Sequence, residues 1–137
     1  MSNFRMTPNN HILIIDDDLA MCQLLQRLLE KSYSVTTKHD GMSAMYWLAQ
    51  GNLPDLIITD LDMPNINGED FVVNLKNSGF FNEVPFIVIT GYSGKEKRLK
   101  CMKLGIHDYF EKPFNPKDLL FSVEVVLKHN LKKLNIQ

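Results

Sequence analysis

Cysteine is scarce in this chain of 137 residues. The two that it has, Cys22 and Cys101, lie far apart and form no CxxC pair. The four histidines also lack the spacing of zinc ligands. This argues against a structural zinc site and favours two free thiols in a reducing cytoplasm.

Long hydrophobic runs are missing too. No apolar run approaches the ~20 residues of a transmembrane helix, and the N-terminus lacks the apolar core of a signal peptide. Neither sign of charge dominates, with 15 Lys and Arg against 16 Asp and Glu. Without a strong net field and without a DNA-binding motif, we expect neither a membrane nor nucleic acid as a direct partner. The expected location is cytoplasmic.

The chain does contain a regular alternation of two patterns. Short apolar runs occupy residues 11–15, 33–37, 55–59, 85–89 and 107–110. Helical patterns occupy residues 19–31, 41–50, 68–78, 93–104 and 116–131, with expected N-caps at Asp18, Asp40, Ser93 and Asn115. The alternation predicts an α/β fold with a doubly wound parallel sheet. We expect one domain over residues 11–131, between tails at 1–10 and 132–137.

Polar residues follow the buried strands at their carboxyl ends. They are Asp16, Asp17 and Asp18 after the first strand, Asp60 and Asp62 after the third, Thr90 and Gly91 after the fourth, and Glu111 and Lys112 after the fifth. Taken singly, each has an ordinary explanation as a helix cap, a turn residue, a strand-end hydroxyl or a surface lysine. Taken together, they would converge on the one rim where doubly wound sheets bind ligands.

The chemistry of this set gives it a purpose. Clustered carboxylates raise one another's pKa, and a hard divalent cation such as Mg²⁺ would relieve the repulsion. A carboxylate can attack phosphorus to form an aspartyl phosphate. The transferring phosphoryl group then needs positioning and charge neutralisation, which a cation, a lysine and backbone N–H groups supply.

Four sequence blocks resemble the motifs of response-regulator receiver domains. They are residues 12–18 (ILIIDDD), 56–68 (LIITDLDMPNING), 88–91 (VITG) and 109–114 (YFEKPF), and the resemblance extends over about residues 11–130. It implies a flavodoxin-like fold with five helices and a five-stranded sheet of order 2-1-3-4-5. It also implies a bacterial two-component signalling switch. Such a switch catalyses only its own phosphorylation and dephosphorylation.

The resemblance assigns a metal site. Asp60 corresponds to the phosphoacceptor. Asp16 and Asp17 correspond to the acidic pair that holds Mg²⁺, Asp17 directly and Asp16 through water, and the backbone carbonyl of Asp62 is a further expected ligand. The side chain of Asp62 and that of Tyr92 occupy variable positions, which tune the lifetime of the phosphorylated state in the family.

The resemblance also assigns the groups that meet the phosphoryl oxygens. Thr90 and Lys112 would each bond one oxygen, and the N–H groups of Leu61 and Gly91 would be further donors. Tyr109 corresponds to a switch aromatic that couples to Thr90. The peptide bond after Lys112 is expected to be cis, so that the ammonium points toward the acceptor.

The implied partners are a sensor histidine kinase or phosphotransfer domain and a downstream effector, with a possible phosphorylation-dependent homodimer. Ala20, Met21 and Leu24, with Phe114 nearby, would form a kinase-docking patch unless they are buried in the core. The five cations of residues 93–104 would attract either an acidic partner or a second receiver.

Two other functions remain open. One is an interaction module that uses the fold without phosphorylation, although such degenerate receivers usually lack one of the acidic pair, acceptor or lysine. The other is an aspartyl-phosphate phosphatase, because Asp60-Leu-Asp62 superficially fits a DxD nucleophile motif. Against the phosphatase, that motif normally follows the first strand, and this chain has no room for a cap domain. The sequence also leaves open whether the chain is a fragment of a longer regulator.

Overall fold

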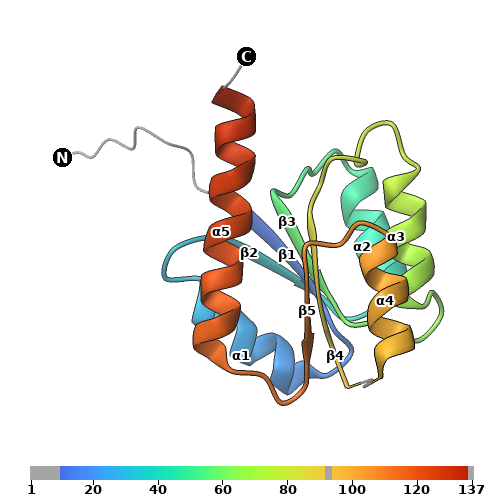
Figure 1. Cartoon of the computed structure of the whole chain (residues 1–137). Coiled ribbons are helices and arrows are strands. Elements are labelled where there is room, and N and C mark those ends of the chain that lie inside the picture. Colours follow the sequence, from blue (N-terminus) through green and yellow to red (C-terminus); the bar gives the residue numbers. More distant parts are fainter. Residues whose placement is uncertain (1–9, 92–93, 136–137) are drawn as a thin grey trace.

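The structure is a computed structural model that describes residues 10–91 and 94–135, with side chains described as far as residue 129. Figure 1 shows a twisted parallel sheet of order β2-β1-β3-β4-β5. The strands are β1 (His11–Ile15), β2 (Ser34–Lys38), β3 (Leu56–Thr59), β4 (Phe86–Thr90) and β5 (Asp108–Glu111). The helices are α1 (Leu19–Leu29), α2 (Gly41–Ala49), α3 (Gly68–Lys76), α4 (Lys95–Lys103) and α5 (Pro116–Asn135). The expected fold class and strand order are confirmed.

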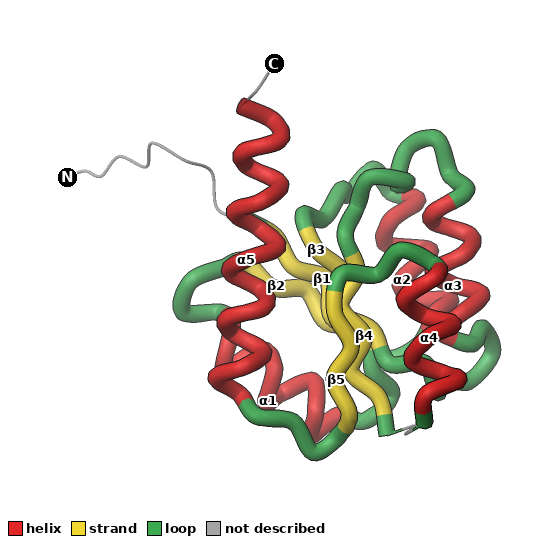
Figure 2. Tube along the Cα trace, viewed as in Figure 1, coloured by secondary structure: helices red, strands yellow, loops and turns green. Residues whose placement is uncertain are grey.

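The helices cover both faces of the sheet. In Figures 1 and 2, α1 and α5 lie on one face, and α2, α3 and α4 lie on the other. Alternate residues of β1 serve the two cores: Ile12 and Ile14 pack toward α1 and α5, whereas Leu13 and Ile15 pack toward the opposite helices. Because β1, β3 and β4 are covered on both faces, they read as continuous apolar runs in the sequence.

Helix starts follow the capping residues. The carboxylate of Asp18 accepts hydrogen bonds from the N–H groups of Ala20 and Met21, at 3.0 and 3.2 Å, at the start of α1. Asp40 accepts from the N–H of Ser43, at 2.7 Å, at the start of α2. Both N-caps were expected from the sequence, and each satisfies donors that the first helical turn leaves unpaired.

Element ends differ from the prediction in several places. Helices α1, α2 and α3 end one or two residues early, and four of the strands shift by one residue at one end or both. Helix α4 begins at Lys95, after Gly94 with φ of 129°, a conformation that favours glycine. The expected N-cap Ser93 lies outside the described residues. Helix α5 continues to Asn135 instead of ending at residue 131, because no glycine or proline interrupts it there.

Strand register aligns the carboxyl ends that carry polar residues. Ile15 of β1 lies opposite Thr59 of β3, so the next residues, Asp16 and Asp60, leave the sheet side by side. On the far side of β3, β4 and β5 end opposite each other in the same way, immediately before Lys112. In Figure 2, the carboxyl ends of β4 and β5 lie at the lower end of the molecule. The sheet therefore gathers polar groups from four strands at one rim.

Candidate phosphoacceptor and metal site

Three carboxylates meet at this rim. Asp16, Asp17 and Asp60 each offer an oxygen atom, and these atoms all lie within 4.8 Å of one another. Asp16 and Asp60 are buried, 2% and 6% exposed, whereas Asp17 is exposed to solvent. Three of the four residues predicted for the metal site are thus brought together, Asp16 and Asp17 from the end of β1 and Asp60 from the end of β3.

Lys112 is the cation of the site. Its Nζ donates to Asp16 Oδ2 at 2.9 Å and to Asp60 Oδ2 at 3.0 Å. Burial alone would lower the pKa of Lys112, but its hydrogen bonds to the two carboxylates outweigh burial and raise that pKa. The Lys112–Pro113 peptide bond is cis, as expected. Lys112 therefore stays charged and lies beside the acceptor carboxylate.

The surroundings of Asp16 disfavour the ionised form of its carboxyl group. Burial raises its pKa, and the nearby charge of Asp60 adds to the rise. The Asp18 N–H, which donates to Asp16 Oδ1 at 3.0 Å, and the Lys112 ammonium act in the opposite direction. Three carboxylates against one ammonium leave the site short of positive charge.

Mg²⁺ would supply the positive charge that the site lacks. The donors are hard carboxylate oxygens, close enough to share one ion, and the site opens to water through Asp17. Mg²⁺ binds through a few carboxylates together with waters and phosphate oxygens. The residues present therefore suit the expected metal.

A cleft adjoins the carboxylates. Its volume is about 480 Å³, and its lining consists of Asp17, Asp18, Asp60, Asp62, Gly91 and Lys112. The Asp62 side chain is exposed, and the Asp62 N–H donates to Asp60 Oδ1 at 3.1 Å. One oxygen of Asp60 thus faces a backbone donor, while the other faces Lys112. An anionic group that enters the cleft would meet both donors, the Asp62 N–H and the Lys112 ammonium.

The loop after Asp60 is fixed by a close backbone approach. The Gly68 N–H donates to the Leu61 carbonyl at 2.9 Å. A Cβ added at Gly68 would lie 2.4 Å from the Asp60 carbonyl oxygen and 2.5 Å from Leu61 Cα. Only glycine fits here, so the first turn of α3 rests directly on the backbone of the acceptor. Leu61, expected as a backbone donor, has a buried side chain in this loop.

The expected switch residues lie on β4 and β5. Thr90 ends β4 with its side chain fully buried, and the next residue, Gly91, reaches the cleft. Tyr109 is 3% exposed, and the Arg98 guanidinium lies 5.6 Å from the centre of its ring. Tyr109 thus stands between the sheet and α4. Tyr92, the variable position after Gly91, lies outside the described residues.

Two neighbours of Asp16 were missed by the sequence analysis. The Cys22 thiol donates to the Asp16 carbonyl at 3.2 Å, and His39 Nδ1 lies 3.4 Å from the same oxygen. Burial raises the pKa of Cys22 to about 11. No local pattern marks these residues, since they come from α1 and from the end of β2 and meet only in the folded chain.

The expected docking patch on α1 is accessible. Leu24 is 43% exposed, Ala20 is exposed, and Met21 and Phe114 are half-buried. Leu19, which was not part of the expected patch, is 58% exposed beside them. These side chains adjoin the acidic rim through Asp18, so a protein bound there would lie close to Asp60.

Among the described residues, no helix has the length and apolar character that crossing a membrane requires.

Comparisons with known proteins give one consistent answer. Residues 12–124 match the response regulator receiver domain family. The chain is 32% identical over 118 residues to the response regulator SaeR of Staphylococcus aureus, covering 85% of this chain and 50% of SaeR. It is 31% identical over 112 residues to the hybrid signal transduction histidine kinase D of Dictyostelium discoideum, covering 82% of this chain and 7% of that protein. The chain thus spans half or less of these relatives.

Solved structures agree with the sequence relatives. The chemotaxis response regulator CheY4 of Vibrio cholerae superposes with a TM-score of 0.78 at 29% identity, over 87% of this chain and 99% of that one. A putative response regulator from Chloroflexus aurantiacus superposes with a TM-score of 0.82 at 26% identity, over 88% and 99%. This chain therefore belongs to the family of response regulator receiver domains, the regulatory modules of phosphorylation-dependent two-component signalling.

Proposed function

We propose that this chain is a signalling switch that accepts a phosphoryl group on Asp60 in a Mg²⁺-dependent reaction. The observation that carries the proposal is the pairing of Asp60 Oδ2 with Lys112 at 3.0 Å, inside a group of three carboxylates at the end of the sheet. A carboxylate oxygen of Asp60 forms the new bond to phosphorus. The bond from phosphorus to the donor breaks, and the donor leaves with its electron pair.

The metal would be held by Asp17, Asp60 and the Asp62 carbonyl, with Asp16 acting through water. Mg²⁺ supplies positive charge that offsets the charge of the phosphoryl oxygens. Lys112 supplies a second, permanent positive charge beside the acceptor, as its raised pKa ensures. The N–H groups of Leu61 and Gly91 and the hydroxyl of Thr90 complete the set of donors.

The phosphodonor would be a histidine kinase or a phosphotransfer protein, and the output would go to an effector protein or domain. Support comes from the family and from relatives whose names include a histidine kinase and a response regulator. The exposed patch around Leu24 on α1 would receive the kinase, since it borders the acidic rim. A kinase bound to this patch would hold its donor histidine near Asp60.

Conformational output would pass through Thr90 and Tyr109. A phosphoryl oxygen on Asp60 offers an acceptor that draws the Thr90 hydroxyl toward it, and Tyr109 responds in the space beside β4. Such a ligand shifts the equilibrium only by its differential contact with the two states. With beryllofluoride as a phosphoryl mimic, Tyr109 should change its aromatic NMR signals in the wild type and not in Thr90→Ala. Unchanged signals in the wild type would end this coupling hypothesis.

The central test is phosphorylation by acetyl phosphate and Mg²⁺, followed by intact mass spectrometry. The wild type should gain one phosphate, and Asp60→Asn should gain none. Asp62→Asn is the matched control, because it removes a neighbouring cleft carboxylate while keeping the Asp62 carbonyl, and it should still gain phosphate. The proposal fails if the wild type remains unmodified or if Asp60→Asn is modified equally.

A further inference from the structure

Backbone pairing at the end of β1 gives way to pairing with side chains at Asp16. The Asp16 N–H still donates to a backbone group of β2, the Lys38 carbonyl, at 3.1 Å. The Asp16 carbonyl instead meets two side chains: the Cys22 thiol donates to it at 3.2 Å, and His39 Nδ1 lies 3.4 Å away. A buried carbonyl oxygen needs such partners, because leaving it unpaired costs free energy.

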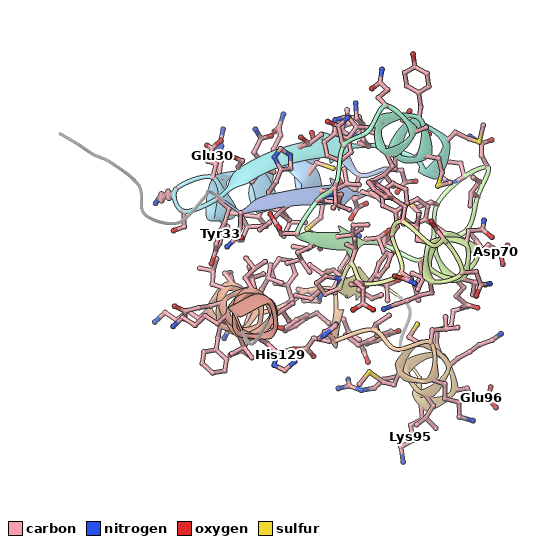
Figure 3. The ribbon with its side chains drawn as sticks, turned by 90° about the horizontal axis from the view of Figure 1, so that it is seen from above. Glu30, Tyr33, Asp70, Lys95, Glu96 and His129 are labelled. Carbon is pink, nitrogen blue, oxygen red and sulfur yellow. The ribbon has the colours of Figure 1, made fainter. Side chains whose placement is uncertain are left out.

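The two side chains come from different elements. Cys22 lies in α1, and its backbone N–H donates to the Asp18 carbonyl at 3.1 Å, so the helix begins against the acidic turn. His39 directly follows β2, and its Nδ1 lies 3.6 Å from the Cys22 sulfur. A turn through Glu30 and Tyr33, which Figure 3 shows beside the sheet, joins α1 to β2. We call Cys22 and His39 the carbonyl clamp.

The clamp acts on the peptide group that joins the two acids of the expected metal pair. The Asp16 carboxylate is already held by the Asp18 N–H at 3.0 Å and by Lys112 at 2.9 Å. The Asp17 carboxylate, in contrast, is exposed and lines the cleft. Its direction depends on the peptide groups on either side of it. Rotation of the peptide before Asp17 would swing this carboxylate within the cleft.

We propose that Cys22 and His39 are positioning residues for the Mg²⁺ site. By holding the carbonyl of Asp16, they aim the Asp17 carboxylate at the ion that it shares with Asp60. Mg²⁺ requires nearly ideal octahedral geometry, so a small rotation of one ligand lowers its affinity. The inference rests on the proposed function and deepens it, because it names residues that act on the site without touching the ion or the phosphoryl group.

This role specifies which hydrogen atoms the clamp carries. A carbonyl oxygen has two lone pairs and can accept from both partners, provided that each is a donor. Burial raises the pKa of Cys22 to about 11, so the thiol keeps its proton at neutral pH. His39 must then carry a proton on Nδ1, the nitrogen that faces the carbonyl. The proton of the neutral ring should therefore be found on Nδ1 in a long-range proton–nitrogen NMR spectrum.

Variants of the two buried cysteines test the thiol, with Mg²⁺ binding to the full chain measured by calorimetry. Cys22→Ala should weaken Mg²⁺ binding about three- to tenfold, at the weak end of what losing a ligand-orienting partner does. Cys22→Ser keeps a donor to the carbonyl and should bind Mg²⁺ nearly as the wild type does. Cys101→Ala is the matched control, because it also removes a buried thiol. Cys101 lies on α4, which Figures 1 and 3 show away from α1.

Variants of His39 test the other half of the clamp. His39→Ala should weaken Mg²⁺ binding, whereas His39→Asn offers an amide N–H in place of Nδ1 and should restore most of the affinity. His39 is exposed, so neither change removes packing from the core. Because one donor can partly replace the other, the double variant Cys22→Ala/His39→Ala should lose about tenfold or more. A double variant that binds Mg²⁺ like the wild type, or a ring proton on Nε2, would overturn the clamp.

Urea unfolding in EDTA separates positioning from a purely structural role. Cys22→Ala and Cys101→Ala each remove a thiol that is almost fully buried, 2% and 1% exposed, so both should lose a similar amount of stability. Only Cys22→Ala should also lose Mg²⁺ affinity. An equal loss of Mg²⁺ affinity in both variants, or none in Cys22→Ala, would show that the thiol only stabilises the fold and would refute the proposal.

The rate of phosphorylation by acetyl phosphate, followed against Mg²⁺ concentration, separates this inference from the proposed function. Cys22→Ala should need more Mg²⁺ for its half-maximal rate and should reach the wild-type rate at saturating Mg²⁺. A lower maximal rate with an unchanged Mg²⁺ requirement would refute positioning of the metal. Normal phosphorylation with unchanged Mg²⁺ binding in the double variant would sink this inference alone. The expected Mg²⁺ binding in a wild type that takes no phosphate on Asp60 would support the clamp while the proposed function fails.

Discussion

Replacing Lys112 with methionine should lower the stability of the metal-free protein and enlarge its response to Mg²⁺. Methionine keeps a similar length and removes the charge that pairs with Asp16 at 2.9 Å and with Asp60 at 3.0 Å. Both carboxylates are almost fully buried, so the few water molecules that reach them from the cleft replace the ammonium only in part. Without Lys112, a cation from solution becomes the remaining way to neutralise the site.

The magnitude follows from this geometry. At an effective dielectric constant near 20, each contact of this length gives roughly 5 kcal/mol of gross attraction. Desolvation offsets most of that, and removing one partner of a buried pair destabilises proteins by about 3–5 kcal/mol. Because the Lys112 side chain is 20% exposed, we expect the lower end, about 3 kcal/mol. For a chain of this length, that corresponds to a fall in Tm of roughly 10 °C.

The assay is urea unfolding followed by circular dichroism, with EDTA and with saturating Mg²⁺. Lys112→Met should lose about 3 kcal/mol in EDTA, and Mg²⁺ should recover a large part of the loss. The exposed control, Lys31→Met, should remain within about 0.5 kcal/mol of the wild type in both conditions. Equal stability of Lys112→Met and the wild type in EDTA, or a smaller response to Mg²⁺, would refute the counter-ion role of Lys112.

The pH dependence supplies an independent check with a definite sign. Burial raises the pKa of Asp16 in the folded protein above its value in the unfolded chain. A carboxyl group of this kind contributes stability to the fold at pH values below its unfolded pKa. That contribution is lost as the pH rises through the folded pKa. Loss of the Lys112 charge should raise the pKa of Asp16 further. The deficit of Lys112→Met in EDTA should therefore shrink as pH falls and Asp16 becomes protonated.

Two further predictions concern the packing around the site. Gly68→Ala should destabilise the chain by about 2–3 kcal/mol in urea unfolding, because its Cβ would lie 2.4 Å from the Asp60 carbonyl oxygen. Gly79→Ala, with nothing within 4 Å, should change stability by less than about 1 kcal/mol, and equal effects would contradict the close approach. Cys22 and Cys101 are buried with raised pKa values, so iodoacetamide at pH 8 should label them only on unfolding, as mass spectrometry would show. Rapid labelling of the native chain would contradict their burial.

The fold and most of the site could be predicted from sequence because the information is local. Buried parallel strands read as apolar runs, and a parallel sheet brings their carboxyl ends to one rim. Asp16 and Asp60 each follow such a run directly, and Lys112 follows the fifth run after Glu111, so the predicted strands place the three at the same rim. The side-chain roles came from the family motifs, whose spacing is preserved along the chain.

Helix ends were predicted less well because competing signals are weak there. Helix α4 starts after Gly94, whose φ of 129° favours glycine, and no side chain caps this start with a hydrogen bond. The C-terminal end of α5 has no stop signal in the sequence, so its length follows from the absence of a helix breaker. Such ends commonly vary by one or two residues, and the functional rim does not depend on them.

Side-chain contacts that depend on how a helix packs against its neighbours could not be predicted. Glu69 meets Lys97 only because α3 rests on the Asp60 backbone through Gly68 and so lies beside α4. Cys22 reaches the Asp16 carbonyl only because α1 packs under the end of β1. Each contact depends on how two elements are placed in space, which no periodicity or spacing in the sequence specifies.

Helix α4 is where these non-local contacts matter most. From one side, Glu69 holds it next to the turn that carries Gly68 and the acceptor backbone. From the other side, Tyr109 supports Arg98. Only one of its nine side chains, Cys101, is buried, so apolar packing alone does little to fix the position of α4. The ion pair with Glu69 and the contact of Arg98 with Tyr109 therefore help to hold α4 against α3 and β5.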